Sequence, residues 1–180
     1  TYALWIQPKG QVVTLENCVI DMIDCTDGRG IKIDEQYVNE VKAPTLNVSG
    51  TTFKTEEKAA VLVKSVDGAI INWGERNDIS KVKADSTFAV WVDEASAAYA
   101  DKVIVNGANK TVEGKSAVVE SAAEISTAIQ DGKTSIVLTA GTYVIPDAAK
   151  GKTLTFVGTG NPKDVKIATN QSGSYEGCNY

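Results

Sequence analysis

Short segments in which apolar and polar residues alternate recur through the first half of the chain. Such alternation over about four to eight residues is typical of a half-buried β-strand. The apolar pairs of four such segments are Leu4/Ile6, Ile31/Ile33, Val61/Val63 and Val90/Val92. The pairs return at a nearly constant interval of about 30 residues, and a strand that returns at such a period predicts a stacked repeat architecture.

A second series of strand-like segments follows the same period. Val13–Ile20 and Leu46–Phe53 can be aligned so that Leu15 matches Val48 and Ile20 matches Phe53. Each repeat therefore holds two or more strands. A unit this small cannot bury its apolar face alone, so neighbouring repeats must stack around a common core.

These features predict an all-β fold, a parallel β-solenoid built from rungs, where a rung is one turn of the solenoid. An apolar strand is followed at a corner by Glu16-Asn17-Cys18 in one repeat and by Ser49-Gly50-Thr51 in the next. This pattern resembles the right-handed parallel β-helix proteins of the pectate-lyase-like group. The resemblance covers residues 2 to 93, and we expect residues 1–93 to form the rungs.

The rhythm changes after Asp93. Val103–Gly107 and Thr111-Val112 are two apolar segments around an Asn106-Gly107 dipeptide, which is a strong hairpin signal. Glu113–Ser116 is polar and short. We therefore expect residues 94–116 to be a hairpin and a linker.

A short amphipathic helix is predicted near residue 121. Ser121 and Glu124 have the spacing of a capping box, Ile125, Ala128 and Ile129 follow at helical spacing, and Gly132 ends the element. Three strand-like segments come next, at residues 135–138, 140–145 and 153–158. This order resembles the amino-terminal entry of a β-helix of the same group, in which one short capping α-helix covers the open end. We assign residues 117–180 to such an entry segment.

An entry segment that follows an exit segment is in inverted order. If the count runs through the chain ends, the intervals from Leu154 to Leu4 and from Phe156 to Ile6 equal the repeat period found within the chain. We predict that residues 117–180 stack beneath residues 1–93 as one domain, in the same molecule or in a neighbour, with Tyr180 close to Thr1. Self-association through the β-helix ends is the intermolecular form of this prediction.

Composition limits the partners. The chain has 43% hydrophobic and 23% charged residues, a formal net charge of -5, and only Arg29 and Arg76 as arginines. No basic stripe is present to neutralise phosphates, so nucleic acid is not expected as a partner. No apolar run is long enough for a membrane span. The first residue, Thr1, suggests a chain cut from a longer protein, and we expect an extracellular or cell-surface protein of the bacterial secreted type.

Residue content also limits the chemistry. The absence of histidine excludes imidazole acid-base catalysis and Ser-His triads. Cys18, Cys25 and Cys178 are too few for a disulfide framework. We expect small residues in solenoid corners or core, with a Cys18–Cys25 bridge as the alternative.

Three aspartates form a candidate metal site. The resemblance to the pectate-lyase-like group implies acidic calcium ligands with a Lys or Arg base. Asp21, Asp24 and Asp27 cluster between two strands, near Arg29, and could place oxygens around a hard cation such as calcium. The alternative is that these aspartates lie in a solvated polar loop. Calcium is the one cofactor that the sequence suggests. No catalytic residue of the group can be transferred to this sequence.

Two tryptophans are candidates for carbohydrate contact. Trp5 and Trp91 fall between inward residues in the first and last of the four repeats, so both should point to the outer surface of one sheet. Such rings can stack on sugars or cover a loop. The sequence thus predicts a non-catalytic secreted or cell-surface module, structural or adhesive, with a glycan or surface partner. The alternative is a polysaccharide lyase or glycoside hydrolase, which a cleft with two or more carboxylates and a basic residue would favour.

Overall fold

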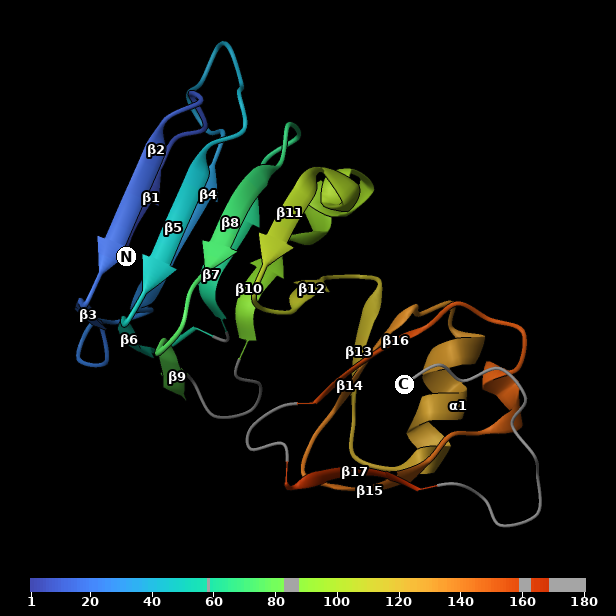
Figure 1. The fold of residues 1–180 in the computed structure, drawn as a ribbon. Coiled ribbons are helices and arrows are strands. Elements are labelled where there is room, and N and C mark those ends of the chain that lie inside the picture. The colour runs from blue at the N-terminus through green and yellow to red at the C-terminus, as the bar shows by residue number, and fades with distance from the viewer. Residues whose placement is uncertain (58, 83–87, 159–162, 169–180) are drawn as a thin grey trace. The chain divides into compact units, whose positions relative to one another are not determined.

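The computed structural model describes residues 1–57, 59–82, 88–158 and 163–168. The chain divides into two compact units, unit 1 at residues 1–116 and unit 2 at residues 117–180 (Figure 1). Strands dominate both units, and each pair of strands whose register is known runs parallel.

Three parallel sheets form unit 1. The first sheet has the order β1 (Tyr2–Ile6), β4 (Arg29–Asp34), β7 (Ala59–Lys64), β10 (Phe88–Val92) and β12 (Lys110–Val112). The second sheet has the order β2 (Val12–Glu16), β5 (Thr45–Ser49), β8 (Ala69–Trp73) and β11 (Val103–Asn106). The third sheet has the order β3 (Val19–Asp21), β6 (Thr52–Thr55) and β9 (Asp78–Val82).

Each complete rung passes once through the three sheets, as in β1, β2 and β3, and the next rung pairs strand for strand with it. Consecutive strands in the sequence therefore belong to different sheets, and neighbours in a sheet come from consecutive rungs. This is a parallel β-helix, as the strand period predicted (Figure 1).

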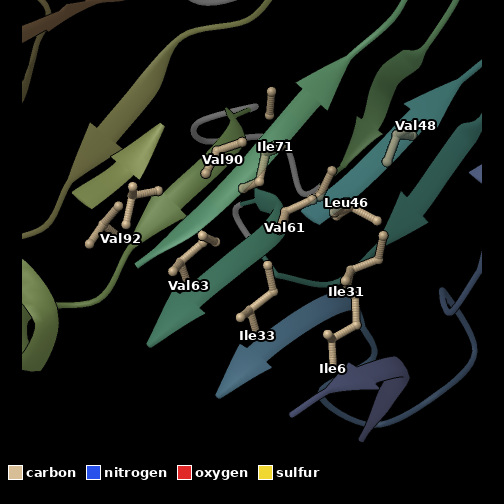
Figure 2. Close-up of a cluster of buried hydrophobic side chains, with 14 of the residues drawn as sticks. Ile6, Ile31, Ile33, Leu46, Val48, Val61, Val63, Ile71, Val90 and Val92 are labelled. Atoms are coloured by element: carbon tan, nitrogen blue, oxygen red, sulfur yellow. The ribbon is translucent and has the colours of Figure 1, made fainter. Parts of the chain in front are cut away.

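The predicted inward ladder of the first sheet is confirmed. Ile31 pairs with Leu4 on one side and Val61 on the other, and Val61 pairs with Val90. A second column runs through Ile6, Ile33, Val63 and Val92. The side chains in the middle of both columns are fully buried and face the second sheet across the core (Figure 2).

The core is completed by the other two sheets. Leu15 pairs with Val48 and Ile20 with Phe53, as the sequence alignment predicted. The Phe53 ring stacks on Trp73 with 5.6 Å between ring centroids. Ile104 on β11 is not part of this core, and 49% of its surface is exposed.

Amide side chains also stack along the second sheet. Asn72 donates to the Asn47 Oδ1 at 2.8 Å, and Asn106 donates to the Asn72 Oδ1 at 2.8 Å. Asn47 in turn donates to the Thr14 hydroxyl at 3.2 Å. One hydrogen-bonded row thus links four successive rungs and fixes their register.

The expected hairpin in residues 94–116 is wrong. β11 pairs in parallel with β8, and β12 pairs in parallel with β10, so the two strands lie in different sheets of a further rung. Gly107 makes this corner possible, with a φ of +83°. A Cβ atom there would lie 2.1 Å from the Trp73 carbonyl oxygen. Only glycine therefore fits where this rung contacts the preceding one. A 3₁₀ helix, η1 (Glu94–Lys102), precedes the two strands.

Unit 2 contains the predicted helix, which follows its first strand. The elements are β13 (Ser116–Val119), α1 (Ala122–Gln130), β14 (Ser135–Leu138), β15 (Gly141–Val144), the 3₁₀ helix η2 (Asp147–Ala149), β16 (Thr155–Gly158) and β17 (Val165–Ala168). β14 lies between β13 and β16, and β15 pairs with β17. Ile125, Ala128 and Ile129 of α1 are buried against Ile136 and Tyr143, as their spacing predicted.

The capping box is present at the start of α1. The Glu124 amide donates to the Ser121 hydroxyl at 3.3 Å, and the Ser121 hydroxyl donates to the Glu124 Oε1 at 2.9 Å. The other Glu124 oxygen accepts from the Glu120 amide at 2.9 Å. The predicted proximity of Tyr180 to Thr1 lies outside the described residues, because residues 169–180 are not among them.

Candidate functional site

The outer face of the first sheet carries the two candidate tryptophans. Trp5 pairs with Lys32, Lys32 with Leu62, and Leu62 with Trp91, so these side chains form one outward row across four strands. This is the row predicted from the alternation in the sequence. The tryptophans at the two ends of this row differ in how far other side chains cover them.

Trp91 is covered and Trp5 is open. Trp91 is only 7% exposed, because Phe88 packs at a ring-centroid distance of 5.1 Å and the indole donates to the Glu113 carboxylate at 3.2 Å. It has little ring surface for a ligand. Trp5, on the outermost strand, is 41% exposed, and its indole donates to the main-chain oxygen of Asp34 at 3.4 Å.

A second exposed aromatic residue lies beside Trp5. Tyr37 is 81% exposed, and its ring centroid is 6.3 Å from that of Trp5, with the two planes inclined by 54°. Its backbone has a φ of +70°, a region that costs a bulky residue about 1 to 2 kcal/mol. A strained, exposed aromatic is a typical mark of a functional position. The sequence analysis missed Tyr37 because it lies in a turn and outside the strand period.

The Trp5 ring borders a shallow hollow of about 450 Å³, which is also lined by Gln7, Lys9 and Gln11. The Gln11 amide donates to the Gln7 main-chain oxygen at 2.5 Å and accepts from the Lys9 amide at 2.9 Å. These bonds hold the segment that follows β1 close to the carboxyl end of that strand. The hollow therefore combines an open indole with amide and ammonium groups, and we call Trp5, Tyr37, Gln7, Lys9 and Gln11 the aromatic platform.

Charges next to the aromatic platform are paired. Lys32 forms an ion pair with Asp34, and its ammonium lies 4.7 Å from the Tyr2 ring centroid and 5.4 Å from that of Trp5. Partial burial opposes the positive charge, but the Asp34 carboxylate and the Tyr2 phenol outweigh it and raise the pKa of Lys32 above its ordinary value. Lys32 thus remains protonated, and its charge is balanced at the edge of the platform.

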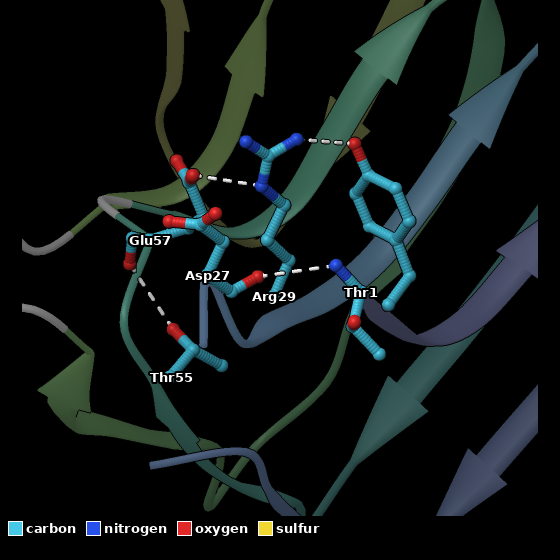
Figure 3. Close-up of polar contacts among 6 residues, drawn as sticks. Thr1, Asp27, Arg29, Thr55 and Glu57 are labelled. Carbon is cyan, nitrogen blue, oxygen red and sulfur yellow. Dashed lines mark hydrogen bonds and ion pairs between the residues drawn. The ribbon is translucent and has the colours of Figure 1, made fainter. Parts of the chain in front are cut away.

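A second hollow, of about 200 Å³, lies on the same face. It is lined by Arg29, Gly30, Ile31, Glu57, Ala59, Leu62, Trp91, Asp93 and Glu113. Arg29 donates through Nε to the Glu57 carboxylate at 2.7 Å and also contacts the Tyr2 hydroxyl (Figure 3). Partial burial opposes the Arg29 charge, yet Tyr2 and Glu57 raise the pKa of Arg29. Three carboxylates and one guanidinium therefore line one hollow.

The carboxylates of this second hollow are already engaged. Glu57 binds Arg29, and the Glu113 carboxylate accepts from the Trp91 indole and from the Glu94 amide, the latter at 3.3 Å. Across the described part of the chain, no group of three or more carboxylate, cysteine or histidine side chains is placed to hold a metal ion. A reaction that uses Glu57 or Glu113 would require one of these contacts to open.

The candidate aspartates do not form a cluster. Asp21 forms an ion pair with Lys54 at 2.7 Å, which lowers the pKa of Asp21. Asp24 and Asp27 are exposed, and Asp27 takes part through its main-chain oxygen, which accepts from the Thr1 amino group at 3.3 Å. Asp21 is the last residue of β3, and Asp24 and Asp27 lie in the exposed segment that follows this strand, so the metal site at these three residues stays a prediction.

Cys18 and Cys25 are both free thiols. The Cys18 Sγ lies 3.3 Å from the main-chain oxygen of Glu16 at a corner of the first rung. Cys178 lies outside the described residues. Within those residues, no helix is long and apolar enough to cross a membrane.

Neither a family model nor a curated protein nor a solved structure matches this chain. The candidate functional features of the molecule are therefore the two hollows of the first sheet and the edges of the two units.

Proposed function

We propose that this chain is a non-catalytic β-helix module of a secreted or cell-surface protein, with a structural or adhesive role, and that its aromatic platform contacts neutral glycans. One observation carries the proposal: Trp5 is 41% exposed on a flat sheet face, next to the 81% exposed Tyr37. The resemblance of its repeats to the pectate-lyase-like group, whose members act on polysaccharides, supports the same class of ligand.

The chemistry of the aromatic platform suits a sugar. Indole and phenol rings offer broad apolar surfaces with one polar edge, which matches a pyranose with its apolar face and hydroxyl rim. Gln7 and Lys9 line the hollow beside the Trp5 ring and add groups that can bond hydroxyls. Few polar groups next to an aromatic wall are typical of a small-molecule site.

The charge favours a neutral ligand over an acidic one. The chain has a formal net charge of -5, and Lys32, whose ammonium lies 5.4 Å from the Trp5 ring centroid, is paired with Asp34. A polyanion would meet a repulsive overall field, which Lys9, the ammonium that lines the hollow, offsets by one charge. We therefore assign neutral glycans, and an acidic polymer serves as the comparison.

A binding titration tests this assignment. Calorimetry with cellohexaose, xylohexaose and mannohexaose should detect binding of at least one, and Trp5→Ala should abolish it. Tyr37→Ala should weaken it. Tyr99→Ala is the matched control, because Tyr99 is also an exposed aromatic of unit 1, at 38% exposure, but lies in η1. Unchanged binding in Trp5→Ala, or equal loss in Tyr99→Ala, would refute the proposal.

The second hollow favours a different function, a polysaccharide lyase or glycoside hydrolase. Glu57, Asp93 and Glu113 line it together with Arg29, which is the combination that such an enzyme requires. The engaged state of Glu57 and Glu113 favours the non-catalytic interpretation instead. An assay for unsaturated or reducing-end products from a uronate polymer and from a neutral glucan separates the two. We expect no product; product that disappears in Glu57→Gln would establish the enzyme.

A further inference from the structure

Unit 1 has one closed end and one open end. In the first sheet the inward column Leu4, Ile31, Val61 and Val90 is continued by Lys110. The Lys110 ammonium donates to the main-chain oxygens of Ala100 and Val103, at 2.5 and 2.8 Å. An inward charge that satisfies main-chain carbonyls ends an apolar column and blocks further strand addition.

At the opposite end of unit 1, no inward charge of this kind occurs among the described residues. β1 and β2 are the outermost strands of the first and second sheets, and their outer edges, which we call the front edge, pair with no strand among the described residues. The inward residues Leu4, Val13 and Leu15 are only partly buried there, whereas their partners Ile31, Leu46 and Val48 are fully buried. The core is therefore partly exposed at the front edge, at Leu4, Val13 and Leu15.

Unit 2 has the opposite arrangement. α1 covers the beginning of its core. β16 and β17 are the last strands of their sheets in the described part of the chain, and we call their outer edges the rear edge. Ile167 pairs with the buried Tyr143 and so continues an inward column, yet it is 56% exposed.

We propose that the front edge is a docking surface for the rear edge of a second copy of this chain, so that copies associate head to tail. The column positions can be matched: Phe156 pairs with the inward Ile136, and Ile6 continues an inward column of the first sheet, so Phe156 of one copy can lie beside Ile6 of the next. In this register Thr155 lies beside Trp5, and its short side chain leaves the indole accessible.

Charge favours the same pairing. Residues 1–28, which form the first rung and its closing loop, contain one lysine and four acidic residues. Residues 147–168, which lead to and include the rear edge, contain four lysines and two aspartates. Opposite net charges on two edges steer their encounter and disfavour like-with-like pairing.

The length of the connection selects a second copy over the same molecule. β12 ends at Val112 and β13 begins at Ser116, and the Ser116 hydroxyl donates to the Val112 main-chain oxygen at 2.6 Å. Such a segment spans at most about 14 Å. Docking the rear edge on the front edge of its own molecule would separate β12 from β13 by seven strand spacings, or about 34 Å. The second copy has no such restriction.

Sedimentation equilibrium tests the proposal. For the natural chain, the weight-average mass should rise above 19.1 kDa, the mass of one chain, as concentration increases. Ile167→Lys changes an exposed side chain of the rear edge and should remain a monomer at all concentrations. Leu4→Lys should do the same from the front edge; if it unfolds unit 1, as measured by circular dichroism, Val13→Lys replaces it.

Mixing the two variants makes the test specific. Each keeps one intact edge, so an equimolar mixture of Ile167→Lys and Leu4→Lys should form a species of two chains and nothing larger. Ile104→Lys is the matched control, since Ile104 is 49% exposed but lies on β11, at the other end of the second sheet from β2, and it should associate like the unsubstituted chain.

Four results would overturn the proposal: a natural chain that stays monomeric, association that survives Ile167→Lys, a mixture without the two-chain species, or an Ile104→Lys variant that dissociates. None of these measurements involves a glycan. Failure of head-to-tail association is thus distinguishable from failure of the proposed glycan contact.

Discussion

Ile33 lies in the middle of an inward column of the first sheet, between Ile6 and Val63, and none of its surface is exposed. Replacement by alanine removes buried methyl groups and leaves a cavity between rungs. We expect Ile33→Ala to lower the free energy of unfolding of unit 1 by about 2 to 5 kcal/mol, measured by urea denaturation. Ile104→Ala, at an exposed position of the same unit, should change it by no more than about 0.5 kcal/mol. Equal losses of unfolding free energy in Ile33→Ala and Ile104→Ala would mean that water reaches the inward column.

Glu124 gives unit 2 a pH dependence. Its bonds from the Glu120 amide and the Ser121 hydroxyl lower the pKa of Glu124 below its ordinary value. Because the folded state prefers the carboxylate, the stabilisation is complete above the pKa of the unfolded chain and is lost as pH falls through the lower, folded pKa.

The corresponding experiment follows the unfolding temperature of unit 2 from neutral to acidic pH. Glu124→Gln should reduce the loss on acidification, and carbon NMR of the Glu124 carboxyl should show its lowered titration directly. Glu120→Gln removes the same charge but neither hydrogen bond, so it should retain most of the loss. If Glu120→Gln and Glu124→Gln behave alike, the cap does not cause the effect.

At the residue scale, sequence alternation predicted which way side chains point but not what covers them. Trp5 and Trp91 share one outward row, as predicted. Trp91 is nevertheless buried, because Phe88 and Glu113 reach it from positions that alternation does not relate to it. Trp5 remains open because its strand has no neighbour on one side among the described strands. The exposure of Trp91 thus depends on a neighbour within its own strand, Phe88, and on one from a later segment, Glu113, and strand alternation predicts neither contact.

At the element scale, the last rung of unit 1 was missed because two of its signals differ from the earlier ones. The step from Val90 to Lys110 is clearly shorter than the steps between the earlier strands of the first sheet. The inward position then holds Lys110, a charge in place of an aliphatic residue. Asn106-Gly107 meanwhile resembles a hairpin turn. The continuing row of Asn47, Asn72 and Asn106 was the signal that could have identified the rung.

Gly107 provides a test of how closely these rungs approach. Alanine there would have a left-handed backbone, which costs about 1 to 2 kcal/mol, and its Cβ would also meet the Trp73 oxygen at 2.1 Å. Gly10 has a similar φ, +76°, but its nearest neighbour would be a Lys42 side-chain carbon at 3.4 Å. Gly107→Ala should therefore lower the free energy of unfolding of unit 1 by more than Gly10→Ala does. Equal effects in urea denaturation would argue against close stacking at this corner.

At the scale of the whole molecule, the strand period was sufficient to predict a parallel β-helix, and the capping box was sufficient to predict the helix of unit 2. Which ends of the units are closed did not follow from the period. It depends on the inward Lys110, on α1 and on the exposed Ile167, and hence on which residue falls at the end of each column. The resemblance to the pectate-lyase-like group stays a prediction.

The function of the whole molecule depends most on whether the Trp5 face binds sugar. The chain has three tryptophans, Trp5, Trp73 and Trp91, so a proton–nitrogen NMR spectrum should contain three indole signals. The Trp5→Phe variant assigns one of them. Titration with the neutral oligosaccharide that binds best should shift the Trp5 indole signal and leave those of Trp73 and Trp91 in place. A titration in which the Trp5 signal does not move, or in which the Trp91 signal moves alone, would contradict the proposed function.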